Sequence, residues 1–162
     1  GFMLAGSRSY STITNRLNLE LDSQLAMNQM ENYIMDCNTN LYFNTNTDTL
    51  FLINKGSSET TYDVHIFRFT GGNIYYGFGE DKATLNNGTY SSSAPVAADL
   101  LVENVTAFSV SYFRADGTEI TTADGPKAAS AVITMTLTRN SVAYSATKTI
   151  ALRNKPTISI VQ

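Results

Sequence analysis

Few side chains in this sequence could carry nucleophilic chemistry. The chain has one histidine, His65, and one cysteine, Cys37, so His65 would have to activate any serine or cysteine nucleophile. His65 stands between Asp63 and Phe67, on the polar alternation of an expected strand, and no serine lies in a Gly-x-Ser-x-Gly context. We therefore interpret His65 as a surface residue and Cys37 as a small buried hydrophobe. We expect that the protein is not an enzyme.

The polar turns offer oxygen ligands but no complete metal motif. Two Cys/His residues in total cannot complete a zinc site. Asn44, Asn46 and Asp48 have the alternate spacing of a calcium loop, but Thr49 and Lys55 stand where that loop needs glycine and a bidentate glutamate. We interpret this segment as a turn, and we predict no metal and no cofactor. A weaker alternative is a calcium ion held by loop carboxylates, either Glu80 and Asp81 or Asp116, Glu119 and Asp124.

Two binding functions differ in how well the composition supports them. A net charge of −3 without any basic cluster argues against nucleic-acid binding, which needs lysines and arginines to neutralise phosphates. Carbohydrate binding stays open as an alternative, although tryptophan is absent. Tyr75, Tyr76 and Phe78 are then the aromatic side chains that could contact a sugar. A surface adhesin or carbohydrate-binding module is therefore the alternative function.

The elements that position these residues begin with a long helix. Residues 8–37 contain neither glycine nor proline and are rich in good helix formers. Residues 1–6 are apolar, and the sequence then turns abruptly polar. We interpret this start as the end of a longer apolar segment that has been removed, and a cloning remnant is the alternative.

Two apolar stripes run along this helix. At about 100° per residue, one arc contains a set that we expect to pack on the protein's own sheet: Leu19, Ala26, Met30, Tyr33, Ile34 and Cys37. Ile13, Leu17, Leu21 and Leu25 follow i, i+4 spacing in a second arc, mainly in the N-terminal half. One sheet cannot cover both arcs of a helix. We predict that Ile13, Leu17, Leu21 and Leu25 form an interface with another partner. The alternatives are that a loop wraps over them or that they are simply exposed.

The remainder, residues 41–162, has the period of β-structure. Short apolar runs at 41–43 and 50–53 predict a hairpin, and residues 62–69 change parity, which indicates a bulge or burial on both faces. Turns are predicted at 71–73, 116–117 and 139–141, a loop at 79–95 and a short helical turn at 97–101. Residues 133–138 alternate strictly between apolar residues and threonines. The expected fold is a single domain of α+β class, a long N-terminal α-helix packed on antiparallel β-sheet.

Two stretches of this sequence resemble the type IV filament superfamily. Residues 17–30 are similar to the helix that follows the membrane segment in minor pilins. Residues 100–108, followed by Tyr112 and the Asp116-Gly117 turn, resemble the corresponding segment of W-type minor pilins and of the J-type pseudopilins of type II secretion. The closing strands at 132–137 and 149–154 fit the same subgroup.

The resemblance implies a mechanical function. Before assembly, such a subunit is anchored in the bacterial inner membrane by its N-terminal helix. It is then extracted into a pilus or pseudopilus, at the cell surface or in the periplasm. The expected partners are other minor and major pilins or pseudopilins, the inner-membrane assembly platform, and the membrane itself through the missing N-terminal segment. Minor subunits of this kind prime or cap filament assembly.

Overall fold

A computed structural model describes residues 2–55, 62–81, 96–121 and 128–161. It contains one long helix, α1 (Phe2–Asp36), followed by nine strands. The strands are β1 (Asn40–Asn44), β2 (Thr49–Lys55), β3 (Tyr62–Thr70), β4 (Asn73–Asp81), β5 (Asp99–Val102), β6 (Val105–Phe113), β7 (Ser130–Arg139), β8 (Val142–Ala151) and β9 (Thr157–Val161). The α+β class predicted from the sequence is confirmed, with the helix first and the sheets after it.

The helix is longer at its start than the sequence predicted. It begins at Phe2 instead of residue 8 and ends at Asp36. The apolar residues 2–6 continue the helix because nothing between them and Ser7 stops it, and the single Gly6 is tolerated inside. Asn38 then ends the helical segment, and its side-chain oxygen accepts a hydrogen bond from the Lys55 amide at 3.0 Å.

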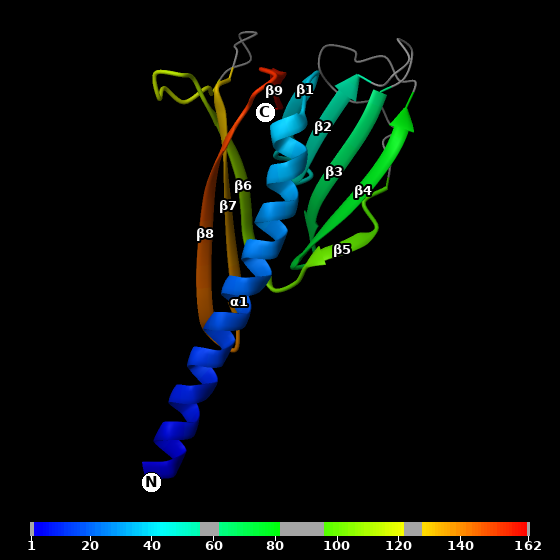
Figure 1. Cartoon of the computed structure of the whole chain (residues 1–162). Coiled ribbons are helices and arrows are strands. Elements are labelled where there is room, and N and C mark those ends of the chain that lie inside the picture. The colour runs from blue at the N-terminus through cyan, green and yellow to red at the C-terminus, as the bar shows by residue number, and fades with distance from the viewer. Residues whose placement is uncertain (1, 56–61, 82–95, 122–127, 162) are drawn as a thin grey trace.

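The strands form two sheets. Six strands pair in the order β5-β4-β3-β2-β1-β9, and three pair in the order β6-β7-β8. In Figure 1 α1 runs between the two sheets, and its N-terminal part projects beyond the ends of both. One core cluster joins residues of the helix to residues of both sheets, from Leu19 to Leu50 and Leu137. The helix is therefore held from two sides.

Most of the short-range pairing agrees with the sequence. The hairpin β1–β2 pairs Asn44 with Thr49, and Gly71 and Gly72 turn β3 into β4 with positive φ. Asn140 and Ser141 turn β7 into β8 in the same left-handed region. These turns sit where the predicted strand runs end.

The parity change in β3 reflects burial on both faces. The register between β2 and β3 runs without a shift from Thr49↔Arg68 to Lys55↔Tyr62, so β3 contains no bulge against β2. Val64 and Ile66 belong to a second small cluster on the face away from the helix, whereas Phe67 belongs to the main core. The parity change over residues 62–69 is therefore explained by burial on both faces and not by a bulge.

Two long-range features were not predicted. Residues 99–102 form the edge strand β5, paired with β4, so the predicted helical turn at 97–101 is wrong. β9 pairs parallel with β1, from Asn40↔Thr157 to Asn44↔Val161. The sheet is thus antiparallel except at that one pair. The loop predicted at 79–95 lies outside the described residues beyond Asp81, and residues 79–81 still belong to β4.

Candidate functional site: the exposed stripe of the long helix

One side of α1 is sealed against the protein's own sheets. The buried side chains are those that the helical period placed together, namely Leu19, Ala26, Met30, Ile34 and Cys37, with Tyr33 partly buried beside them. Ser23 is buried among them and donates its hydroxyl hydrogen to the Glu20 carbonyl at 2.8 Å. The polar group is satisfied within the helix, so this face can pack without an unpaired donor.

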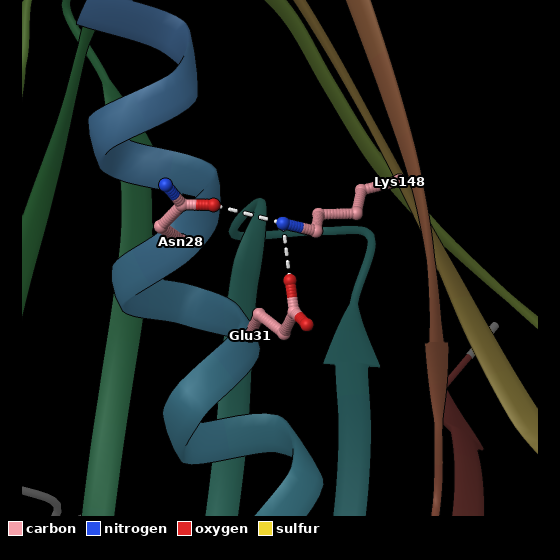
Figure 2. Close-up of polar contacts among 3 residues, drawn as sticks. All are labelled: Asn28, Glu31 and Lys148. Atoms are coloured by element: carbon pink, nitrogen blue, oxygen red, sulfur yellow. Dashed lines mark hydrogen bonds and ion pairs between the residues drawn. The ribbon is translucent and has the colours of Figure 1, made fainter.

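A polar contact links the helix to β8. Figure 2 shows Lys148 reaching from β8 to two helix side chains. Its Nζ donates to Asn28 Oδ1 at 2.8 Å and forms an ion pair with Glu31. All three groups are partly open to solvent, so this contact contributes about 1 kcal/mol or less. The rotation of α1 is set mainly by its buried face, which packs on the sheets and leaves the opposite side of the helix toward solvent.

That opposite side carries the second apolar stripe. Ile13, Leu17, Leu21 and Leu25, which we call the exposed stripe, are 58%, 53%, 57% and 70% exposed. No described loop covers them. Four large aliphatic side chains in one line are unusual on a solvated helix, where scattered single ones are the norm. The spacing of 12 residues from Ile13 to Leu25 corresponds to about 18 Å of helix axis.

One further residue extends the stripe and was missed from the sequence. Tyr10 is 75% exposed and lies three residues before Ile13, hence on the same side of the helix. The i, i+3 spacing between Tyr10 and Ile13 in the sequence could have identified Tyr10 as part of the stripe. With Tyr10, the apolar line extends about one turn further toward the N-terminus of α1.

Comparison with known proteins finds similarity in structure. No protein-family model matches the chain, and no curated protein matches it in sequence. Among solved structures, a type IV-like pilin from Thermus thermophilus superimposes with a TM-score of 0.58 over 85% of this chain and 98% of that chain, at 10% sequence identity. The chain has a type IV pilin-like fold. The fold that the resemblance in the sequence implied is thus confirmed.

In this pilin-like fold His65 is not the surface residue that the sequence suggested. It lies on the helix side of β3, where its ring stacks on Tyr33 with centroids 4.3 Å apart. Its Nδ1 forms a hydrogen bond with the Tyr76 hydroxyl at 2.8 Å. Burial lowers the pKa of His65, and the nearby Asp63 opposes that shift. The prediction of a surface position from the polar alternation was wrong because both faces of β3 are packed. On the helix side, the aromatic ring of Tyr33 partly covers the imidazole of His65.

The aromatic residues of β4 do not form one open platform. Tyr75 and Tyr76 are neighbours in a strand and therefore point to opposite faces of the sheet. Tyr76 stacks on Tyr33 at 5.4 Å between centroids, and its burial raises its pKa. Phe78 is 52% exposed. The three candidates for sugar contact are thus divided between two faces of the six-stranded sheet.

The candidate calcium segments have turn geometry. The Asn44 Oδ1 accepts the Asn46 amide at 3.0 Å, and Asp48 has a φ of 47° in the turn between β1 and β2. Asp116 Oδ1 accepts the Thr118 amide at 2.9 Å, and this bond lowers the pKa of Asp116. Asp124 and the side chains of Glu80 and Asp81 lie outside the described part of the chain. Among the residues described, no three His, Cys, Asp or Glu side chains come together as metal ligands.

Cys37 has the environment predicted for it. It is fully buried, its Sγ donates to the Asn40 carbonyl at 3.1 Å, and burial raises its pKa to about 12. The thiol therefore stays protonated at neutral pH and is a poor nucleophile. As for a membrane span, no helix within the described ranges combines sufficient length with sufficient apolar character to cross a bilayer.

Proposed function

We propose that the protein is a minor pilin or pseudopilin, a non-enzymatic structural subunit that primes or caps a type IV pilus or a type II secretion pseudopilus. The observation that carries the proposal is the exposed stripe, four apolar side chains on a helix that projects beyond both sheets. The structural likeness to a type IV-like pilin supports it. In this function Ile13, Leu17, Leu21 and Leu25 are covered by the helices of neighbouring subunits.

The free energy available from the exposed stripe is sufficient for such contacts. Full burial of one large aliphatic side chain contributes about 1.5–3 kcal/mol. Because each of the four is already partly covered, the remaining burial contributes on the order of 4–7 kcal/mol in total before the cost of association. This amount would hold a subunit among several neighbours in a filament, yet it is small enough to leave the isolated domain monomeric or weakly associating.

The proposal includes partners and a location. The partners are other minor and major pilins or pseudopilins, together with the inner-membrane assembly platform. The subunit is held in the bacterial inner membrane before assembly and then resides in the pilus or pseudopilus. The low charge of the surface, −3 over 162 residues, is compatible with close packing among like subunits.

The test places a charge in the exposed stripe. Leu17→Asp with Leu21→Asp, introduced in the source bacterium, should lower incorporation of the subunit into sheared filaments at least tenfold. The thermal midpoint of the purified domain should remain unchanged, since both side chains are exposed. Asn32→Asp is the matched control, because it adds a carboxylate at an exposed position of the same helix. Incorporation of the double variant at the wild-type level would refute the proposal.

A further inference from the structure

A second apolar surface lies beside the exposed stripe, in a groove between α1 and β5. The groove has a volume of about 350 Å³ and is lined by Asp22 and Leu25 of the helix and by Leu100, Leu101, Val102 and Glu103. Leu25 and Leu100 are 70% and 51% exposed. Since Leu25 belongs to both surfaces, the apolar line of α1 continues sideways onto β5 without a break.

Two carboxylates stand at this groove without a cation. Asp22 and Glu103 are both exposed, and neither forms an ion pair with another described residue. From residue 17 to the end of α1 the helix has no lysine or arginine, and β5 has none. Asp99, exposed at the start of β5, adds a third negative charge nearby. The groove therefore combines an apolar floor with an uncompensated negative potential.

The chemistry of these residues limits what can bind there. A metal ion does not fit, because no three ligating side chains converge in the described residues. A purely apolar segment would cover Leu25 and Leu100 but would desolvate the carboxylates without a partner, which is costly. A segment with apolar side chains and one lysine or arginine satisfies both halves of the groove. Because the adjoining stripe follows a helix axis, another helix lying alongside α1 would contact both surfaces at once.

We propose that the α1–β5 groove receives a helix of a neighbouring filament subunit, with apolar side chains against Leu25 and Leu100 and a lysine or arginine paired with Asp22 and Glu103. This inference rests on the proposed function and names the partner's chemistry. The chain itself shows that such a helix is available, since its α1 places the exposed Arg16 one turn from Ile13. A head-to-tail contact of this kind joins unlike surfaces and so continues into an open filament.

The test is site-specific photo-crosslinking during filament assembly in the source bacterium. A benzophenone amino acid replaces Leu100 in the full-length protein, and the cross-linked peptide of the neighbour is sequenced. We expect a peptide from a helix with a lysine or arginine within one turn of the attachment point. Asp22→Asn with Glu103→Gln should lower the cross-link yield at least tenfold. Asp36→Asn, an exposed carboxylate on the same helix outside the groove, should leave the yield unchanged.

A benzophenone at Leu17 separates the two proposals. Cross-links from Leu17 without cross-links from Leu100 would overturn the groove inference and leave the proposed function standing. A cross-linked peptide without a basic residue, or a yield insensitive to the loss of both carboxylates, would also overturn the groove inference. If neither position cross-links to a filament subunit, the proposed function fails and the groove inference fails with it.

Discussion

Leu19 and Leu21 provide a matched pair for separating folding from assembly. They are the same residue type on the same helix, two positions apart, but Leu19 is 1% exposed and Leu21 is 57% exposed. Truncation of a fully buried leucine to alanine costs about 2–5 kcal/mol, whereas truncation of a half-exposed one costs about 0.5 kcal/mol or less. For a domain of this size each kcal/mol shifts the thermal midpoint by roughly 2–4 °C.

The expected results are therefore opposite in the two assays. Leu19→Ala should lower the thermal midpoint of the purified domain by about 4–20 °C. Leu21→Ala should change it by about 2 °C or less, yet it should reduce incorporation into filaments because it removes part of the exposed stripe. Thermal unfolding followed by circular dichroism measures the first effect, and immunoblotting of sheared filaments measures the second.

One result would refute the reasoning behind this pair. If Leu21→Ala destabilised the isolated domain as much as Leu19→Ala, the exposed stripe would be covered within the protein itself. No interface with other subunits would then be needed to explain it. Full incorporation of Leu21→Ala together with an unchanged midpoint would show that Leu21 contributes nothing to either process.

Three further predictions concern the isolated domain. Burial lowers the pKa of His65 below its ordinary value of 6.5, so the unfolded state binds a proton at this residue more readily than the folded state, and the free energy of unfolding should fall as the pH decreases below about 6.5. In urea titrations at several pH values, His65→Phe should remove this part of the pH dependence, and an unchanged pH dependence in that variant would be the contrary result. Gly77→Ala should lower the urea midpoint because the added Cβ would clash with the Val96 carbonyl oxygen, which should reduce the free energy of unfolding by about 1–3 kcal/mol. An unaltered midpoint would contradict the packing of residues 96–97 on β4. Tyr112→Phe should leave the free energy of unfolding unchanged or raise it by about 1 kcal/mol, because the buried hydroxyl has no hydrogen-bond partner among the described residues. A clearly lower thermal midpoint in this variant would show that the hydroxyl is paired.

Local periodicity predicted the helix and its two faces well. The arc that begins at Leu19 and ends at Cys37 is the buried one, and the exposed arc consists of Ile13, Leu17, Leu21 and Leu25. These features depend on contacts a few residues apart, which the 3.6-residue period encodes directly. The start of the helix was less predictable because a helix end depends on a stop signal, and the apolar residues 2–6 supply none.

Long-range pairing was not predictable in the same way. The two apolar runs of three residues after Pro95, separated by Asp99, have no decisive period. Only pairing with β4 makes Asp99–Val102 a strand. The partly buried position of His65 depends equally on Tyr33, which reaches it from the helix. The exposed stripe was predicted as a surface, but its extension to Leu100 required the helix and β5 to be placed side by side. Sequence patterns show which face is apolar, whereas the structure shows what stands opposite it.

The parallel pairing of β1 with β9 has a consequence for how the subunit is made. Residues 40–44 leave the ribosome soon after the helix, but their partner strand, residues 157–161, follows more than 100 residues later in the sequence. Until residues 157–161 emerge, one edge of the larger sheet remains open to any extended chain nearby. Closing it requires two segments more than 100 residues apart to be brought together, which is a slow step for non-local contacts. A nascent chain would therefore benefit from a chaperone that shields β1 until β9 has emerged.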